Sequence, residues 1–502
     1  DVHTRDYTLN ALRDALPELA TCFPVYRTYV TPAGAGPDDR RYVDWAIAQA
    51  RKRSNAVDLS VFDFLRRVLL LDGFGDAEDT VRQEAIAVAM RFQQFTAPLM
   101  AKGFEDTVLY RHHALVALNE VGGNPRRFHT STVVLHRANA ERARDWPHAM
   151  LTTSTHDTKR SEDVRTRLCV LTELADEWKA RVQRWARLNH RRKRRPRADT
   201  AWPGPRIEYL LYQTLVGTWP TGDFDRAAYR ERIHAYALKA TREAKTHTSW
   251  VNPDAEYESA LRTFVDALLP EAGSGPFLAD FEPFAREVAW FGALASLGQQ
   301  LLKLTVPGVP DVYQGTELID LSLVDPDNRR PVDYALRRRL LDEFLAGDGT
   351  PGAHGAPDAV GGAGDRARRL LDDPTDGRAK LSLTAQTLRL RAEHPALFRD
   401  GSYLPLEVRG ARAEHVVAFL RRHRDRAALV VATRWHATLT ERATHLPLGA
   451  EVWGDTCIAL PDEARGGWHD VLTGTRLAGG RPALPLADVL AAWPVALLAD
   501  ER

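Results

Sequence analysis

The sequence predicts a mixed α/β fold, in which a parallel sheet with helical crossovers is followed by a small antiparallel β domain. Three short apolar runs, at residues 23–30, 150–155 and 302–306, have the composition of buried strands. Long stretches of helical periodicity separate them, and strands joined through helices normally lie parallel in one sheet. Beyond about residue 402 the pattern changes to short alternating runs with turns between them, which is typical of antiparallel strands.

The helices are predicted from apolar residues that recur at helical spacing. Leucine recurs on one face of residues 7–21. Helical periodicity then dominates two long segments, about 42–145 and 161–300, which we interpret as insertions between the strands. A further helix is expected at 335–346, whereas the stretch 347–376 is rich in Gly, Ala, Asp and Pro and predicts a loop.

These elements suggest two domains. Residues 1–400 hold the parallel strands, the insertions and a last helical stretch at 380–396, and residues 401–502 hold the antiparallel strands. A closed barrel of parallel strands requires eight of them. Only three are visible, so the other five either escape the pattern or precede Asp1.

Charge and cysteine content exclude several classes of protein. The chain has 502 residues, with 68 basic and 67 acidic side chains and a net charge of +1, so nothing attracts it as a whole to nucleic acid or to an anionic membrane. Its three cysteines, Cys22, Cys169 and Cys457, are too few and too far apart for a disulfide framework and suit a reducing cytoplasm. No apolar run reaches the roughly 18–20 residues that span a bilayer.

Cofactor and nucleic-acid motifs are absent from the sequence. No cysteine or histidine spacing is typical of a metal site, and no glycine-rich nucleotide loop occurs, so neither a metal nor an organic cofactor is expected. The basic run 191–197 resembles a nucleic-acid patch in isolation, but a solvated loop is the better interpretation in a chain without excess charge.

The densest polar cluster runs from Ser154 to Arg165, at the carboxyl end of the expected strand 150–155. Catalytic groups of barrel enzymes lie at such strand ends. An aspartate beside a histidine, as in His156 and Asp157, can bind adjacent sugar hydroxyls and stabilise a positively charged sugar transition state. The alternative is a solvated helix start, which explains Glu162 well but explains the His-Asp pair poorly.

Two further clusters admit both a functional and a structural interpretation. Lys102, Glu105, Asp106 and Tyr110 can form a rim that grips sugar hydroxyls, or they can be ion pairs on an exposed helix. The segment 307–317 combines two prolines and two glycines, which force a sharp turn. That turn either fixes Tyr313 and Glu317 near a barrel mouth or is purely structural.

These blocks resemble the maltooligosyltrehalose synthases, a branch of the α-amylase superfamily. The similarity rests on residues 100–107 and 154–165 and on the turn 307–317, and it extends from about residue 17 to the C-terminus. Further similar blocks lie at residues 23–29, 118–123 and 209–217.

The resemblance implies a (β/α)₈ barrel with large helical insertions and a C-terminal β domain. It also implies an intramolecular transglucosylation, in which the reducing-end α-1,4 bond of a maltooligosaccharide becomes an α,α-1,1 bond. The expected pathway partner is a maltooligosyltrehalose trehalohydrolase. Superfamily members use an aspartate nucleophile, a glutamate acid/base and a third aspartate that stabilises the transition state.

The resemblance assigns roles to individual residues of this chain. Asp157 matches the third aspartate, and His156, Lys159 and Arg160 beside it are expected to bind substrate. The residues expected to hold the reducing-end glucose are Lys102, Glu105, Asp106 and Tyr110.

Two blocks of the superfamily pattern are not found. The nucleophile and acid/base should lie at strand ends before Phe23, and nothing in residues 1–22 fits them. We therefore expect that the chain begins within the barrel and is inactive by itself. Leu109 stands where the family commonly has an aromatic residue, which predicts weaker stacking and more hydrolysis. An α-glucan hydrolase, a 4-α-glucanotransferase and a non-catalytic glucan-binding module remain as alternatives.

Overall fold

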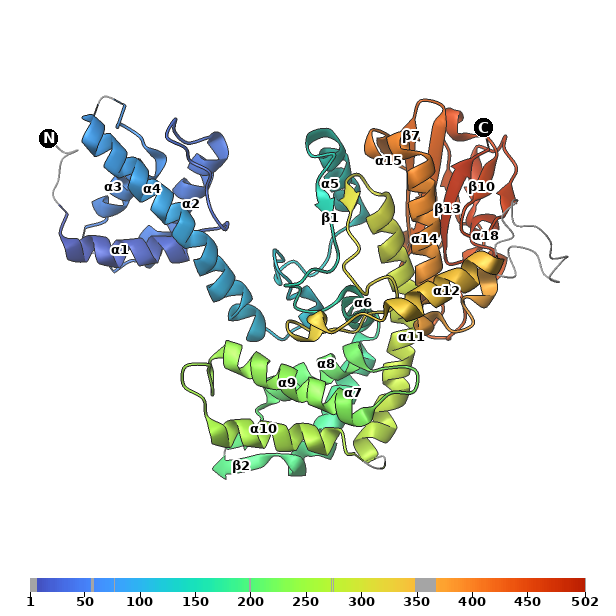
Figure 1. Ribbon diagram of the computed structural model, residues 1–502, viewed down its shortest axis with the longest axis horizontal. Coiled ribbons are helices and arrows are strands. Elements are labelled where there is room, and N and C mark those ends of the chain that lie inside the picture. Colours follow the sequence, from blue (N-terminus) through green and yellow to red (C-terminus); the bar gives the residue numbers. More distant parts are fainter. Residues whose placement is uncertain are drawn as a thin grey trace. The chain divides into compact units, whose positions relative to one another are not determined.

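The computed structural model describes residues 7–55, 58–75, 77–197, 200–271, 273, 275–347 and 367–501. The chain divides into two compact units (Figure 1). The first unit comprises residues 1–112 and 243–249, and the second comprises residues 113–242 and 250–502. The proposed domain boundary at residue 400 stays a prediction.

The first unit is helical. Its helices α1 to α4 pack around buried apolar side chains that include Leu19, Phe62 and Phe92, and α4 continues into a π-helical turn and a 3₁₀ turn. The periodicity at residues 7–21 is confirmed as α1. The elements are α1 Leu9–Thr21, α2 Pro37–Arg53, α3 Ser60–Leu70, α4 Asp79–Met100, η1 Ala101–Glu105 and η2 Val108–Tyr110.

The strand expected at residues 23–30 is wrong. This segment is irregular and partly buried. The backbone N–H of Val30 donates to Oε1 of Gln93 at 2.8 Å, and Nε2 of Gln93 donates to the carbonyl of Val30 at 3.1 Å. One glutamine side chain on α4 thus satisfies both backbone groups, which in a sheet would bond a neighbouring strand.

Helices also dominate the chain between residues 113 and 399. The bounds are η3 Val116–Leu118, α5 Thr132–Asp145, α6 Glu162–Val170, α7 Ala175–Asn189, η4 His190–Arg192, α8 Pro205–Thr218, α9 Arg226–Ala244, α10 Ala255–Leu268, α11 Pro276–Thr305, η5 Asp327–Arg329, α12 Tyr334–Gly347, η6 Pro374–Asp376, α14 Arg378–Glu393 and α15 Pro395–Arg399. The long helix α11 contacts α6, α8 and α14. At Gly292 the contact with α6 is so close that a Cβ atom would lie 2.6 Å from Cγ of Arg167.

A two-stranded parallel sheet joins two distant parts of the second unit. Strand β1 (Met150–Leu151) pairs with β4 (Val309–Pro310), with Met150 opposite Val309. The preceding Gly308 has φ +128°, and a Cβ atom there would lie 2.7 Å from the side chain of Leu151. Glycine is therefore required where the chain enters β4.

The sheet corrects two strand predictions. The strand expected at 150–155 is confirmed only for its first two residues, and the strand expected at 302–306 is wrong. Leu297, Leu301 and Leu304 are buried at helical spacing, so the apolar run continues the buried face of α11. The strand forms only after the turn at residues 307–308.

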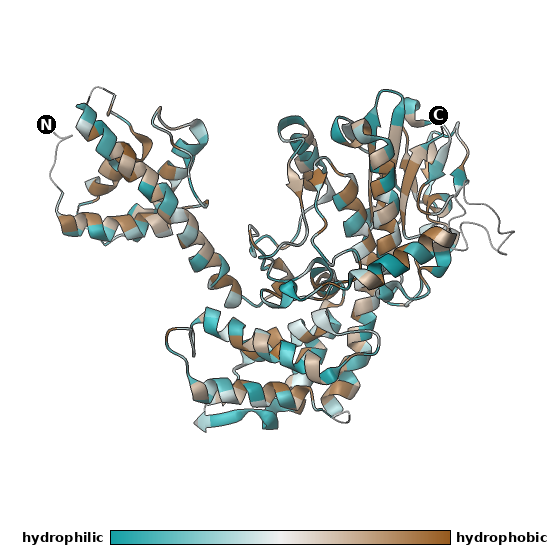
Figure 2. Cartoon of the chain, in the orientation of Figure 1, coloured by the Kyte–Doolittle hydropathy of each residue, from teal (hydrophilic) through white to brown (hydrophobic). Residues whose placement is uncertain are grey.

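Residues 402–500 contain antiparallel strands, as the alternating pattern predicts. One sheet has the order β11-β10-β13-β8-β7-β5 and the other has the order β12-β9-β6. Figure 2 shows that hydrophobic residues are frequent in these strands. The bounds are β5 Ser402–Pro405, β6 Val408–Arg409, β7 Val416–His423, β8 Arg426–Thr433, α16 His436–Leu439, α17 Gly449–Trp453, β9 Cys457–Ala459, η8 Asp462–Ala464, β10 Trp468–Asp470, β11 Arg476–Leu477, β12 Ala483–Pro485, α18 Leu486–Val489 and β13 Val495–Asp500.

Asp470, at the end of β10, makes the stability of this sheet depend on pH. Burial raises the pKa of its carboxyl to about 6 from the ordinary 3.8, although hydrogen bonds from Thr473 and from the Leu472 backbone oppose the shift. The folded protein therefore holds this proton more tightly than the unfolded chain. Its stabilising contribution is complete below about pH 4 and is lost as the pH rises towards 6.

Asp470→Asn is expected to raise the free energy of unfolding at pH 7 by about 1–2 kcal/mol and to leave it little changed at pH 4, because the neutral amide avoids a buried charge. Urea unfolding of both proteins at the two pH values measures the effect. Asp425→Asn, at an exposed carboxylate, is the matched control. An equal shift at both pH values would contradict the assignment.

Three further sequence predictions concern the loop at 347–376, the basic run 191–197 and the absence of a membrane-spanning segment. Most of the loop expected at 347–376 lies outside the described residues, and its last ten residues include two short helical turns. The basic run 191–197 belongs mainly to a hairpin of β2 (Arg194–Arg197) and β3 (Thr200–Trp202). Within this run, Nζ of Lys193 lies 2.6 Å from Oε2 of the buried Glu208. Among the described helices, none is long and apolar enough to cross a membrane.

Candidate active site

The turn after β1 presents His156 and Asp157 to solvent. Oγ1 of Thr155 accepts from the backbone N–H of Asp157 at 3.1 Å, and Nδ2 of Asn328 donates to the carbonyl of His156 at 3.0 Å. Both the histidine and the aspartate side chains are exposed, and neither makes a hydrogen bond or ion pair with the described residues. The backbone is thus held by the protein while the two side chains are available to a ligand.

Asn328→Ala is expected to loosen this turn, because Asn328 also donates to the carbonyl of Thr155 at 3.3 Å. Two hydrogen bonds to the turn are lost, at a cost of about 1–2 kcal/mol. Faster amide hydrogen exchange at residues 155–158 would report it. The control Asn10→Ala, on an exposed face of α1, should leave this exchange unchanged.

Lys159 and Arg160 face the interior. The Glu120 carboxylate accepts from their backbone N–H groups, at 2.9 Å and 3.3 Å, and from Nη1 of Arg165 at 3.0 Å. Nη2 of Arg160 donates to the hydroxyl of Tyr236 at 2.5 Å. Arg160 therefore bonds protein groups, and substrate contact by either residue stays a prediction. Glu120 was missed as an individual residue, and its only signal was the block 118–123.

The first residues of α6 are not a solvated helix start. Glu162 and Asp163 are 0% and 1% exposed, and each pairs with a lysine from another helix. Nζ of Lys380 lies 2.7 Å from Oε1 of Glu162 and 2.8 Å from Oδ2 of Asp163, and Nζ of Lys303 lies 3.1 Å from Oε2 of Glu162. These four residues form a buried charge network of two carboxyl groups and two amines.

The charges in the network alter its pKa values. Burial alone would raise the pKa of Glu162, but the positive charges of Lys380 and Lys303 outweigh it and bring the pKa to about 2. Burial raises the pKa of Asp163, and the nearby Lys380 limits the rise. Burial lowers the pKa of Lys303, and Glu162 opposes that shift. Glu162 is thus ionised and held by its two lysines.

In the first unit, the cluster at residues 102–110 contains both exposed and buried members. Nζ of Lys102 lies 2.6 Å from Oδ2 of Asp106, which is the ion pair that the structural interpretation predicts. Glu105 is buried and accepts a hydrogen bond from the hydroxyl of Tyr26, and Tyr110 is buried as well. The structure therefore brings the four residues onto one segment and leaves Lys102 and Asp106 as its accessible pair. Their role in sugar binding stays a prediction.

The turn 307–317 holds Glu317 within its own loop. Oε2 of Glu317 accepts from the backbone N–H of Gly315 and from Nε of Arg337, both at 3.0 Å. Nη2 of Arg337 in turn donates to the carbonyl of Gly315 at 2.7 Å. These contacts favour the structural interpretation of Glu317.

Comparison with known proteins places the chain in a family. No protein-family model matches the sequence. A protein of Mycobacterium tuberculosis, named provisionally as a maltooligosyl trehalose synthase, is 40% identical over 415 residues, which cover 82% of this chain and 46% of the relative. Over the residues that match, the chain belongs to the maltooligosyltrehalose synthase family.

Solved structures agree with this family. The maltooligosyltrehalose synthase of Arthrobacter ramosus is 33% identical to this chain and superposes with a TM-score of 0.77. The match covers 100% of this chain and 55% of the Arthrobacter ramosus chain. A point mutant of that synthase gives a TM-score of 0.76, and a hypothetical synthase of Sulfolobus tokodaii gives 0.65 at 26% identity. The chain spans about half the length of these maltooligosyltrehalose synthases.

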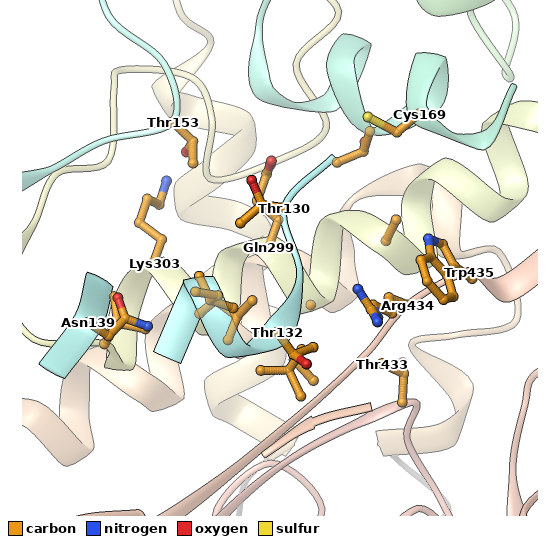
Figure 3. A pocket seen from close by; sticks show the side chains of 18 of the residues that line it. Thr130, Thr132, Asn139, Thr153, Cys169, Gln299, Lys303, Thr433, Arg434 and Trp435 are labelled. Carbon is orange, nitrogen blue, oxygen red and sulfur yellow. The ribbon is translucent and has the colours of Figure 1, made fainter. Parts of the chain in front are cut away.

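A cavity close to the candidate turn of this maltooligosyltrehalose synthase homologue is lined in part by Thr152 and Thr153. It has a volume of about 680 Å³, and Figure 3 shows Thr153 and Lys303 at one end and Arg434 and Trp435 at the other. Many of its lining residues are polar, such as Thr130, Asn139 and Gln299, but the surface that they expose to the cavity is mainly apolar, whereas a sugar site needs many exposed hydrogen-bonding groups. We therefore do not assign it as a glucan subsite.

Proposed function

We propose that this chain is part of a (1→4)-α-D-glucan 1-α-D-glucosylmutase, which moves the reducing-end glucose of a maltooligosaccharide from an α-1,4 to an α,α-1,1 bond. The observation that carries the proposal is the exposed pair His156 and Asp157 on a held backbone at the carboxyl end of β1. The 40% identity to a protein named as a synthase of this family supports it.

The proposed roles follow from the chemistry of glycosyl transfer. Asp157 stabilises the positive charge that develops on the sugar ring, and His156 binds a hydroxyl of the same glucose. Lys102 and Asp106 bind the released reducing-end glucose while it turns over, and Glu105 and Tyr110 shape that surface. Leu109 lacks the aromatic ring that would stack on the released glucose, so this glucose is held less firmly. Because water competes with the returning glucose, some hydrolysis is expected.

The proposed fold is the carboxyl-terminal part of a (β/α)₈ barrel. The parallel pairing of β1 and β4, with a long helical connection between them, supports this proposal. Two strands of two residues each are a very small sheet, and parallel sheets are normally covered on both faces. The remaining strands of the barrel, with the nucleophile and the acid/base, would be supplied by other residues.

A longer protein of the relatives' length that contains these residues is expected to convert maltopentaose into a non-reducing product. A reducing-sugar assay with chromatography of the products tests this. Steady growth of reducing ends would make the protein a hydrolase, and a ladder of longer glucans would make it a 4-α-glucanotransferase. A maltooligosyltrehalose trehalohydrolase would consume the product, and we place both enzymes in the cytoplasm.

A further inference from the structure

We propose that Lys303 and Lys380 are positioning residues, which fix the His156–Asp157 turn through the buried charge network. The role of Asp157 as the supporting carboxylate rests on the proposed function, whereas the mechanical coupling does not. Lys303 comes from the last turn of α11 and Lys380 from the first turn of α14. Two helices that are distant in sequence therefore reach the same acidic helix start.

The hydrogen bonds of the network end on the residues that lead into the turn. The hydroxyl of Thr153 donates to Oε2 of Glu162, the same oxygen that pairs with Lys303. The backbone N–H of Glu162 donates to Oγ of Ser154 at 2.9 Å. Residues 153 and 154 are thus attached to the network two to four positions before the exposed pair.

The loop that faces the turn is attached to the same network. The backbone N–H of Asp320 donates to Oδ2 of Asp163 at 2.8 Å, and the carboxylate of Asp320 accepts from Oγ of Ser161 at 2.7 Å. Ser296 of α11 donates to the other oxygen of Asp163. The loop continues to Asn328, which holds the carbonyl of His156. The turn is therefore fixed from both of its flanks.

Stability alone does not account for this arrangement. Burying four charges costs desolvation energy that their attraction often only offsets, and apolar side chains of similar volume commonly give equal stability. What the charges add is direction, because three of the four carboxylate oxygens accept from particular donors and Oε1 of Glu162 faces Nζ of Lys380 at 2.7 Å. A site that stabilises a transition state needs side chains held within about 0.5 Å, and such support comes from the groups behind them.

Two variants separate positioning from general stability. Lys303→Met removes one charge and leaves Lys380 paired with both carboxylates. Thr153→Val removes one hydroxyl without any change of charge, so it remains informative if Lys303→Met folds poorly. Lys303→Arg keeps the positive charge and tests whether it restores the wild-type behaviour. Thr130→Val is the matched control, because Thr130 is an exposed threonine that lines the same cavity as Thr153 and Lys303.

The first measurement is amide hydrogen exchange of the 502-residue chain. Lys303→Met and Thr153→Val are expected to speed exchange at residues 152–158 about tenfold, with no change at β7 and β8. Thr130→Val should not change it, and Lys303→Arg should restore most of the protection. Exchange that is equally faster throughout the chain, or that is unchanged at residues 152–158, would overturn the positioning role.

The second measurement is a double-mutant cycle in the affinity for maltopentaose, by isothermal titration calorimetry. Asp157→Ala is expected to weaken binding about tenfold in the wild-type chain and less than about threefold in the Lys303→Met background. Equal losses in both backgrounds would show that Lys303 does not act through Asp157. If exchange changes as expected but Asp157→Ala never affects binding, the positioning stands and the proposed function fails.

Discussion

Lys380→Met is expected to lower the free energy of unfolding of the second unit by about 3–5 kcal/mol, because it breaks a buried pair by removing one partner. Lys380 is 1% exposed and contacts Glu162 and Asp163, and its Nζ also donates to the carbonyl of Leu318 at 3.3 Å. Burial alone would lower the pKa of Lys380, but the attraction of the two carboxylates raises it. The amine is therefore charged under all conditions in which the protein is handled.

Guanidinium unfolding, followed by circular dichroism, measures the effect. Lys179→Met, at an exposed lysine of α7, is the matched control and should change the free energy by less than about 0.5 kcal/mol. The double variant Lys380→Met/Asp163→Asn should recover more than about 1 kcal/mol, since it removes the carboxylate that has lost its partner. If the double variant is no more stable than Lys380→Met, the loss does not arise from unpaired charge.

This network also marks the limit of what the sequence predicts about the site. The position of the cluster 154–165, at the end of a strand, is visible from residue types and spacing. The burial of Glu162 is not, because its partners lie 141 and 218 positions further along the chain. A run of charged residues at a helix start has the same pattern whether it faces water or two lysines. The alternative interpretation, a solvated helix start, is therefore wrong for Glu162 and Asp163.

The strand predictions failed for related reasons. The aromatic and β-branched residues 23–30 suit a strand, but the segment is irregular, and at its end Gln93 bonds both backbone groups of Val30. The apolar run 302–306 suits a strand or a buried helix equally, and the length of α11 decided between them. Helices with clear apolar periodicity, at residues 7–21 and 335–346, were predicted within a few residues of their observed bounds.

The 502-residue chain, incubated alone with maltopentaose, is expected to form a non-reducing product at a rate at least about 10⁴-fold below that of the Arthrobacter ramosus synthase. A retaining displacement needs two carboxylates about 5–5.5 Å apart on either side of the bond. Among the described acidic residues of the second unit near the turn, Glu162 and Asp163 are paired with buried lysines and Glu317 with Arg337. Asp157 cannot supply both functions, and we do not expect Asp311, which is half-buried beside β4, to supply the second.

Product analysis by chromatography, with the Arthrobacter ramosus synthase as the positive control, measures this rate. Calorimetry on the same chain should still detect binding of maltopentaose, because His156 and Asp157 are exposed and their binding of sugar does not require a nucleophile or an acid/base. Turnover at a rate near that of the control, abolished by Asp157→Ala, would contradict the prediction. It would mean that the chain contains a nucleophile and an acid/base, which must then be sought among the half-buried acids beside β4, beginning with Asp311, whose carboxylate lies 3.5 Å from the hydroxyl of Thr152.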